Sequence, residues 1–308
     1  MSDTELYFSL NNYLRRKFGS KVIKLSIDGG FSCPNRDGSI ARGGCIFCSE
    51  EGSGEFSGDR NLSITQQMLD QTSLLSSKWP DSKYIAYFQS FTNTYDTVEN
   101  LRKKYDEALA FPNVVGIAIA TRPDCLSSEV LELLTEYNSR TFLWVELGLQ
   151  TIHEKTADFI RRGYDLKTFD TAMKNLGSLK IKTVAHLILN LPDESFDDMR
   201  NSLGYVSDMG VWGVKLQMLN VLKNTDLEKH YLSDRFYLRT ADEYIELVSN
   251  LITYLPPDIV IHRVTGDGKK ESLLAPVWVL NKRYVLNGIQ KYMRSNNLYQ
   301  SKNYLDIC

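Results

Sequence analysis

Residues 31–48 read Phe-Ser-Cys-Pro-Asn-Arg-Asp-Gly-Ser-Ile-Ala-Arg-Gly-Gly-Cys-Ile-Phe-Cys, and this stretch decides how the rest of the chain is interpreted. Three of the five cysteines of the 308-residue chain lie here, at Cys33, Cys45 and Cys48. The close pair Cys45 and Cys48 can bind one metal centre. Two adjacent glycines, Gly43 and Gly44, allow the loop to bring Cys33 back toward that pair. The stretch therefore predicts a loop wrapped around an inorganic group.

The composition is that of an ordinary folded protein, with 43% hydrophobic residues, 24% charged residues and a net charge of −2. This balance argues against a protein that binds nucleic acid through its overall charge, although it allows a local basic face. The N-terminus is acidic and polar and the apolar runs are short, so we expect no signal peptide and no membrane span. Few, clustered cysteines fit a metal site in a reducing cytoplasm better than a secreted disulfide frame.

Strand-like and helix-like patterns alternate along most of the chain. The six predicted strands are Val22–Asp28, Tyr84–Gln89, Val114–Ala120, Thr141–Gly148, Thr183–Leu189 and Val214–Leu219. Because parallel strands need crossover connections, six βα units predict a parallel sheet. Six is two short of a complete eightfold barrel, so we predict an α/β fold, a partial (βα)6 TIM-like barrel. We assign residues 1–222 to this core and 223–308 to a C-terminal α-rich extension that covers its mouth or open side.

Polar and unusual residues follow the predicted strands. Besides the cysteine loop, they occur at Gln89–Tyr95, Thr121–Cys125, Glu146–Thr151, Asn190–Glu194 and Gln217–Asn224. In barrels of this class the chemistry takes place at the C-terminal mouth, which such loops build. Turn-forming residues also occur between elements that have no function. The loops taken together, rather than any single one, therefore predict the site.

The clustered thiols lack a nearby fourth ligand. A zinc site usually takes four Cys or His ligands, and here the fourth would have to be Cys125, Cys308 or one of the four scattered histidines. A [4Fe–4S] cluster also usually takes four thiolates. Three thiolates would leave one iron open to an exogenous group. A non-enzymatic zinc-binding or nucleic-acid-binding module stays open as the alternative.

The cysteine loop resembles that of the radical S-adenosylmethionine (radical SAM) superfamily. There, three loop cysteines after the first strand hold a [4Fe–4S] cluster, and SAM binds the fourth iron. The usual spacing is C-x3-C-x2-C, whereas eleven residues separate the first two cysteines here. This longer gap is similar to that of the YhcC/YtqA-like branch, a neighbour of the elongator-type enzymes. The resemblance to that branch covers nearly the whole chain. The segments that carry it are Cys33–Gly38, Tyr87–Tyr95, Thr121–Leu126, Glu146–Thr151, Thr265–Asp267, Leu274–Pro276 and Leu280–Lys282.

The resemblance implies both cofactors and their chemistry. Cys33, Cys45 and Cys48 would hold the cluster, and one electron passed to SAM would release methionine and a 5′-deoxyadenosyl radical. The backbone at Phe88, Gln89 and Ser90 would meet the methionine amino group. An electron donor such as flavodoxin or ferredoxin is implied as a partner.

Further cofactor contacts are implied on later strands. Glu146 would accept hydrogen bonds from the ribose hydroxyls, with a pairing to Arg161 or Arg162 as the alternative. Arg162 or Lys182 would face the SAM carboxylate, or else be a solvated charge. Gln150 belongs to the matching motif after the fourth strand.

Two positions depart from the branch pattern, which has glycine where this chain has Asn190 and Asn224. Asparagine tolerates left-handed backbone angles better than most residues do. The segment Leu187–Pro192, which contains Asn190 and ends in Pro192, would flank the adenine. An altered pocket wall is therefore expected, with SAM binding kept.

Two residues are candidates for the substrate side of the site. Cys125 follows the third strand, where its thiol would face the mouth and donate a hydrogen atom or bind substrate; a buried, inert thiol is the alternative. His262, next to Arg263, is the histidine that we expect closest to the substrate.

The substrate is suggested by the resemblance. Elongator-type relatives modify the wobble uridine of tRNA, which implies conversion of its 5-carboxymethylaminomethyl group to 5-aminomethyl, with tRNA as partner. Basic and aromatic residues suit phosphates and unstacked bases. They occur near the N-terminus and in the C-terminal extension: Arg15–Lys17, Lys21, Lys24, Lys282, Arg283, Lys291, Arg294, Tyr284, Tyr292 and Tyr299. A radical SAM enzyme that acts on a peptide or a small metabolite is the other alternative.

Overall fold

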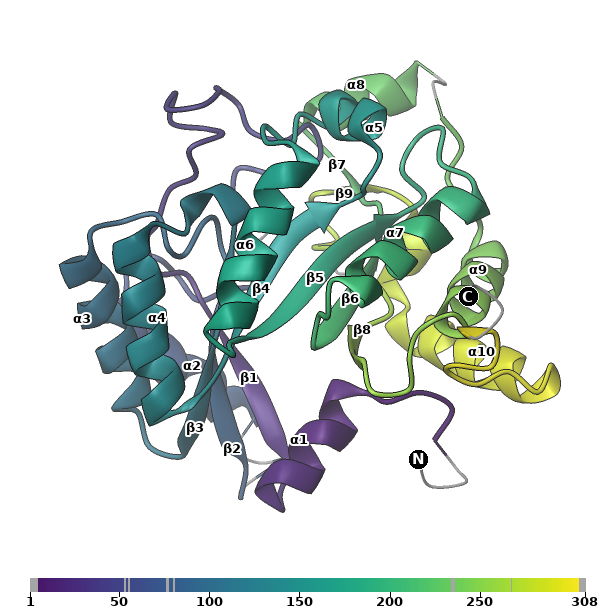
Figure 1. Cartoon of the computed structure of the whole chain (residues 1–308). Helices are drawn as coiled ribbons and strands as arrows, with labels where there is room; N and C mark the ends of the chain where they lie inside the picture. Colours follow the sequence, from purple (N-terminus) through teal and green to yellow (C-terminus); the bar gives the residue numbers. More distant parts are fainter. Residues whose placement is uncertain are drawn as a thin grey trace.

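The computed structural model describes residues 5–304 except 53, 55, 76–77, 80, 234–235 and 267. Its centre is a parallel seven-stranded sheet, in the order β1-β2-β3-β4-β5-β6-β8, that curls into a half-barrel (Figure 1). The strands are β1 (Val22–Ile27), β2 (Lys83–Phe88), β3 (Val114–Thr121), β4 (Phe142–Gln150), β5 (Lys182–Leu189), β6 (Gly213–Met218) and β8 (Val260–Arg263). The predicted α/β partial barrel is confirmed.

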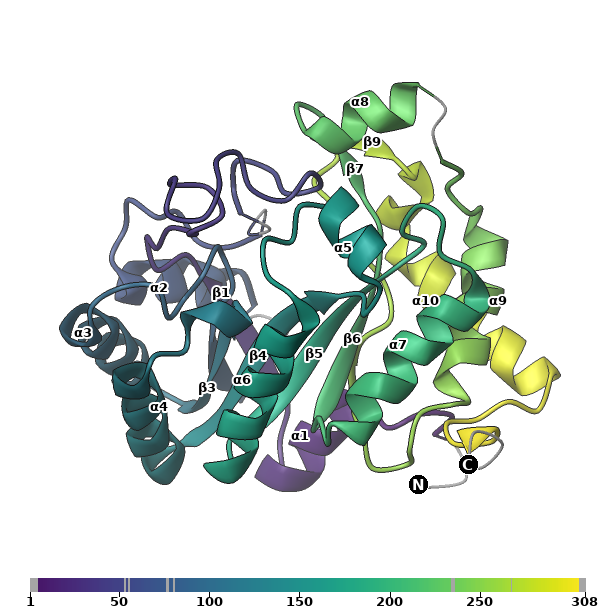
Figure 2. The ribbon, with the colours of Figure 1, turned by 45° about the horizontal axis from the view of Figure 1, so that its top comes forward.

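Helices join successive strands and cover the outer face of the sheet (Figure 2). These are α2 (Ile64–Leu75), α3 (Val98–Leu109), α4 (Ser128–Arg140), α6 (Leu166–Ser178) and α7 (Phe196–Asp208). Their apolar faces and the sheet form one buried core. A capping box begins α7, because Ser195 and Asp198 each accept a hydrogen bond from the other's backbone N–H. The short helix α5 (Glu154–Phe159) precedes α6, and Gly163, which lies between them, has a φ of 80°.

The seventh strand comes from the C-terminal part of the chain. Strand β8 pairs in parallel with β6, so the sheet continues one strand beyond the six that the sequence predicts. The sequence pattern misses β8 because it is only four residues long and ends in the polar pair His262 and Arg263. These two residues thereby enter the barrel wall.

The rest of the C-terminal part is rich in helix, as predicted. It contains α8 (Asp226–Leu232), α9 (Ala241–Ile252), the 3₁₀ helix η2 (Val277–Leu280) and α10 (Lys282–Ser295). A capping box formed by Thr240 and Glu243 begins α9. A small antiparallel sheet joins β7 (Val221–Leu222) to β9 (Leu273–Ala275). The division at residue 222 stays a prediction.

The N-terminal segment closes the end of the half-barrel away from the cysteine loop. Helix α1 (Leu10–Phe18) lies there (Figure 1) and contributes Leu10 and Leu14 to an inner core that includes Trp144. Residues just before α1 continue the sheet edge, because the Ile261 N–H donates to the Phe8 carbonyl. The lumen is therefore sealed from below, and its open end lies at the strand carboxyl ends.

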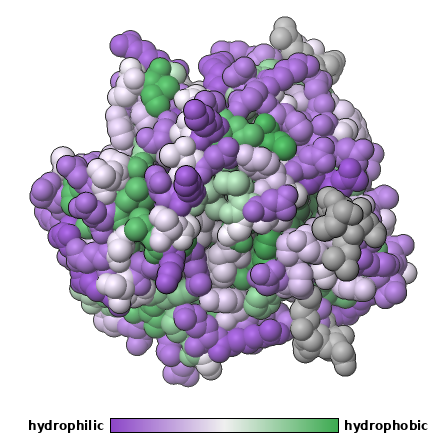
Figure 3. Space-filling view, viewed as in Figure 1, coloured by the Kyte–Doolittle hydropathy of each residue, from purple (hydrophilic) through white to green (hydrophobic). Residues whose placement is uncertain are grey.

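The surface in the orientation of Figure 1 is mostly hydrophilic, with hydrophobic residues in separate small groups (Figure 3). This fits helices whose apolar faces turn inward. In the described part of the chain, no helix is long and apolar enough to cross a bilayer.

Gln300 ties both ends of the described chain to the barrel. Its side chain is buried, accepts from the Phe8 N–H and donates to the carbonyls of Pro256 and Ile259. Gln300→Ala leaves these three groups without their partner, so the free energy of unfolding should fall by about 3 kcal/mol. Denaturant titration measures the change. The exposed neighbour substitution Lys302→Ala should cost less than about 0.5 kcal/mol, and equal losses for both variants would contradict the assignment.

Candidate active site

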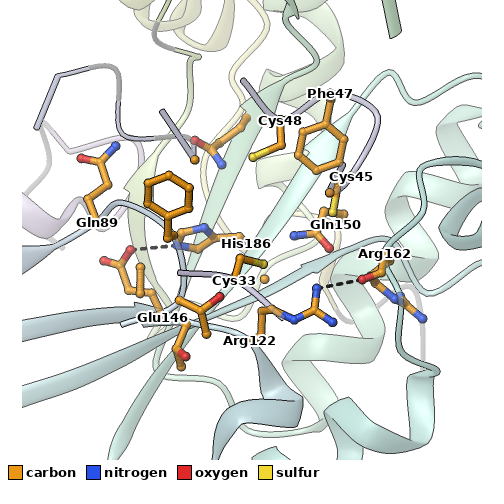
Figure 4. A pocket seen from close by; sticks show the side chains of 18 of the residues that line it. Cys33, Cys45, Phe47, Cys48, Gln89, Arg122, Glu146, Gln150, Arg162 and His186 are labelled. Carbon is orange, nitrogen blue, oxygen red and sulfur yellow. Dashed lines mark hydrogen bonds and ion pairs between the residues drawn. The ribbon is translucent and has the colours of Figure 1, made fainter. Parts of the chain in front are cut away.

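A pocket of about 920 Å³ opens at the carboxyl ends of the strands, and we call it the mouth pocket. Residues of the cysteine loop and of β2, β3, β4, β5, β6 and β8 line it. All three predicted ligands, Cys33, Cys45 and Cys48, are among them, and their sulfur atoms point toward a common space (Figure 4). The structure thus brings together the thiols that the sequence separates.

Contacts within the cysteine loop fix its shape. The Cys33 carbonyl accepts from the N–H groups of Arg36 and Asp37. The guanidinium of Arg36 donates to the carbonyls of Cys48 and Ser49, which joins the two ends of the loop. Gly44 must be glycine, because it has a φ of 80° and a Cβ there would lie 2.8 Å from Arg36 Nε. The loop is therefore held in shape by contacts among its own residues.

The thiols are suited to a cationic inorganic group. Burial and the neighbouring Cys48 raise the pKa of Cys45 to about 12, so its thiolate needs positive charge beside it. Asn35 Nδ2 lies 3.5 Å from Cys45 Sγ and supplies one hydrogen bond. Within the described residues, no three Cys, His, Asp or Glu side chains are arranged to hold a metal ion. Three thiols that face one space fit a [4Fe–4S] cluster, in which each thiolate binds its own iron.

Two arginines form the wall opposite the thiols. Arg162 has 1% of its side chain exposed and donates to the carbonyls of Leu149 and Thr151 at 3.2 and 2.7 Å. Arg122 donates to the Arg162 carbonyl (Figure 4) and pairs with Asp124. The predicted alternative of a solvated Arg162 is therefore wrong. Lys182 lies at the start of β5, away from the pocket, and its Nζ is 5.6 Å from the Trp212 ring centroid.

Glu146 occupies the floor of the mouth pocket and is fully buried. Its Oε1 accepts from Trp144 Nε1 at 2.8 Å. Its Oε2 accepts from Tyr87 Oη and His186 Nε2, each at 2.8 Å, and from the ammonium of Lys215. The predicted ion pair with Arg161 or Arg162 is therefore wrong, and the partner is Lys215. The ribose-binding role of Glu146 stays a prediction.

The charge balance of this floor follows from its contacts. Burial would raise the pKa of Glu146, but Lys215, the hydrogen bond from His186 and the charge of Lys24 hold it well below its usual range. Burial, followed by the charge of Lys215, lowers the pKa of His186 to about 4. At neutral pH the floor therefore contains an ionised carboxylate and a neutral imidazole that donates from Nε2.

The other predicted cofactor residues divide into two groups. Gln89 and Gln150 line the mouth pocket. Phe88 and Ser90 are buried behind its wall, where only their backbone can serve the predicted role. Asn190 is buried and bonds to the Tyr237 carbonyl; neither it nor Pro192 belongs to the lining. Their role beside the adenine stays a prediction.

Both asparagines that replace glycine have left-handed backbones, with φ of 66° at Asn190 and 64° at Asn224. These positions thus require the conformation that glycine provides. The expectation that asparagine tolerates it is confirmed.

The two substrate-side candidates lie outside the lining. Cys125 belongs to the 3₁₀ helix η1 (Pro123–Cys125), and its Sγ lies 3.7 Å from Asp124 Oδ1. Burial, followed by Asp124, raises the pKa of this thiol, so it stays protonated. The placement of His262 near the substrate is wrong, because its ring is buried below the floor against Trp144 and Trp212. Its neighbour Arg263 does line the pocket. Cys308, the other candidate for a fourth ligand, is outside the described residues.

Two known protein-family domains match most of the chain, including most of the barrel and part of the cysteine loop. The Radical SAM superfamily matches residues 37–206, and the Radical_SAM C-terminal domain matches residues 211–295. The chain belongs to the radical SAM superfamily. As a radical SAM protein, it uses a [4Fe–4S] cluster and SAM.

Similar proteins place the chain in the YhcC/YtqA branch. It is 45% identical over 302 residues to the uncharacterized protein YtqA of Bacillus subtilis, covering 98% of this chain and 94% of that protein. It is 35% identical to the protein YhcC of Escherichia coli K12, covering 94% and 92%. Human elongator complex protein 3 is 27% identical over 183 residues, which are 57% of this chain and 31% of that protein.

A solved structure shows the same fold. The archaeal Elp3 of Methanocaldococcus infernus, with an N-terminal deletion, superposes with a TM-score of 0.68 at 17% identity. The match covers 91% of this chain and 64% of that one. At this identity, the likeness establishes the fold of this radical SAM protein and nothing finer.

Several radical SAM pocket residues were missed from the sequence. Tyr87, Lys215 and Arg122 line the pocket, yet none was singled out as a site residue. A signal existed, because Lys215 and His186 are titratable residues with apolar residues on both sides of them in their strands. Such a residue, in a strand buried on both faces, must point into a polar lumen.

The neutral His186 should make the free energy of unfolding of this radical SAM protein depend on pH. Its pKa is about 4 in the folded protein and about 6.5 in the unfolded chain, so the unfolded state binds the extra proton. This contribution is complete above pH 6.5 and decreases by about 2 kcal/mol toward pH 4.5. Denaturant unfolding at pH 6.5 and pH 4.5 should show that the free energy of unfolding decreases less for His186→Gln than for wild type. An equal loss would show that His186 is protonated in the native state.

Proposed function

We propose that this radical SAM enzyme acts on the wobble uridine of tRNA and converts its 5-carboxymethylaminomethyl group to 5-aminomethyl. In the balanced reaction SAM is the two-electron oxidant and is consumed to methionine and 5′-deoxyadenosine, while water completes cleavage of the N–CH2 bond and the two carboxymethyl carbons leave as glyoxylate. The likeness to elongator complex protein 3 supports this substrate class. The alternatives are a peptide or a small metabolite as substrate, and both are compatible with the same barrel. The tRNA nucleoside profile of a deletion strain distinguishes them from tRNA. Membership of the radical SAM family argues against the non-enzymatic zinc-binding alternative.

Basic and aromatic side chains beside the mouth carry the proposal. Lys282 Nζ lies 5.7 Å from the ring centroid of Phe56, and Phe56 lines a cavity that adjoins the mouth pocket. Arg263 lines both. A cation above an exposed aromatic ring suits a phosphate and an unstacked base.

The N-terminal basic residues do not contribute to this surface. Arg15–Lys17 end α1, on the side of the barrel away from the cysteine loop (Figure 1). Lys24 is inside the barrel, where burial lowers its pKa to about 8 despite the charge of Glu146. The RNA-binding prediction is therefore restricted to the C-terminal residues near Lys282.

In this proposal, different groups of residues at the site have different roles. Cys33, Cys45 and Cys48 would hold the cluster, which when bound supplies the electron that cleaves SAM. Arg122 and Arg162 provide positive potential toward the SAM carboxylate. The buried floor around Glu146 excludes water from below and fixes the lining side chains of β2, β5 and β6. The sealed floor therefore directs substrate entry to the mouth, and an external protein such as flavodoxin or ferredoxin would supply the electron.

The cluster assignment predicts a sharp difference among the cysteines. After anaerobic reconstitution, Cys33→Ala, Cys45→Ala and Cys48→Ala should each lose the visible iron–sulfur absorption and form no 5′-deoxyadenosine, because one iron loses its thiolate. Cys125→Ala should keep both signals, and its RNA product yield then tests its predicted role. Loss of the cluster in Cys125→Ala would contradict the three-thiolate assignment.

The substrate assignment predicts a change in tRNA nucleosides. A strain that lacks this gene should accumulate 5-carboxymethylaminomethyl-type wobble uridines and lose the aminomethyl form, as measured by mass spectrometry of digested tRNA. The wild-type gene should restore the profile, whereas the Cys45→Ala gene should not. An unchanged profile in the deletion strain would reject tRNA in favour of a peptide or small metabolite.

A further inference from the structure

A second cavity, of about 640 Å³, adjoins the mouth pocket, and we call it the side chamber. It shares four lining residues with the mouth pocket, Phe47, Gln89, Gln217 and Arg263. A molecule in the side chamber would therefore lie directly beside SAM in the mouth pocket. We propose that the side chamber holds the wobble base and that Arg263 binds the carboxylate of its 5-carboxymethylaminomethyl group. This inference rests on the proposed function and adds a substrate subsite to it.

The walls of the side chamber suit a pyrimidine ring. Phe47 and Phe56 offer aromatic faces on which a base can stack. Gln89, Gln217 and Asn220 add three side-chain amides. Because an amide both donates and accepts, it can match the N–H and carbonyl groups of a uracil edge. Stacking together with amide pairing is the usual way in which proteins read an unstacked base.

The charge of the side chamber favours an anionic substituent. Arg263 is the only charged residue among the described residues that line it. Its Nη1 donates to Gln217 Oε1 at 3.3 Å, which fixes the guanidinium at the wall shared with the mouth pocket. A carboxylate in this position would accept a charge-assisted hydrogen bond.

The positive charge of Arg263 should also distinguish the substrate from the product. The substrate side chain carries a carboxylate beside its amine, whereas the product retains only the amine, which is cationic at neutral pH. Arg263 would therefore attract the substrate and repel the product. Such a contact would favour exchange of product for new substrate without a movement of the barrel.

Binding without turnover provides the test. The probes are two anticodon hairpin RNAs that are identical except at the wobble base, which is 5-carboxymethylaminomethyluridine in one and 5-methylaminomethyluridine in the other. Only the first has a carboxylate. Affinities are measured anaerobically on protein that carries cluster and SAM, with no reductant added. Wild type should bind the carboxylate hairpin at least about tenfold more tightly, because a hydrogen bond to a charged group contributes this much.

Substitutions then locate the discriminating group. Arg263→Met should remove the preference, and Arg263→Lys should keep part of it because the charge remains. Arg200→Met is the matched control, because Arg200 lies on α7, outside both cavities, and pairs with Asp197; it should leave the ratio of the two affinities unchanged. Cluster absorption and thermal unfolding show that each variant is folded.

Gly266→Val tests the location of the base independently. A Cβ at Gly266 would lie 3.1 Å from Asn220 Oδ1, so a larger side chain narrows the side chamber. Hairpin affinity should fall while SAM affinity is unchanged.

Three results would overturn the inference. One is an Arg263→Met variant that keeps the wild-type preference, and the second is one that weakens both hairpins equally, which would indicate a backbone phosphate contact. A wild-type protein without preference would also overturn it. The tRNA nucleoside profile of the deletion strain is a separate measurement, so it decides independently whether the proposed function fails as well.

Discussion

The buried carboxylate of Glu146 is the constraint on which the barrel depends. It joins β4 to β2 through Tyr87, to β5 through His186 and to β6 through Lys215. An ionised carboxylate without these donors would be too costly to bury. Once they are present, the strands must keep the register that brings the donors to one point. The walls of the mouth pocket are therefore fixed by a single polar centre below it.

This polar centre divides the lumen into layers of different character. Below it, Trp144 and the residues of α1 form an apolar plug. Above it, the thiols face Arg122 and Arg162 across the mouth pocket. Water is excluded from the bottom and admitted from the top, which is the arrangement that a reactive intermediate requires. The fold thus shields the mouth pocket from water on one side and leaves it open to substrate on the other.

Much of this could be predicted from the sequence. The βα alternation predicts the half-barrel, and the spacing of Cys33, Cys45 and Cys48 predicts the ligand loop, because both patterns are local. Strand β8 could not be predicted, since its four residues pair only after α9 has brought them to β6. Lys215 was missed for a similar reason. Its partner Glu146 lies 69 residues away, and only the register of three strands brings them together.

The two ends of the described chain meet at one place. The Gln300 N–H donates to the Leu6 carbonyl at 2.9 Å, and Leu6 lies just before α1, which is at the end of the barrel away from the cysteine loop (Figure 1). Because Leu6 and Gln300 are in contact, a short linker can join these two positions in a circular permutant. A new opening in an exposed connection on the same side would leave the mouth untouched. Affinity tags or surface attachments placed at this end would likewise leave the entrance clear for a large RNA.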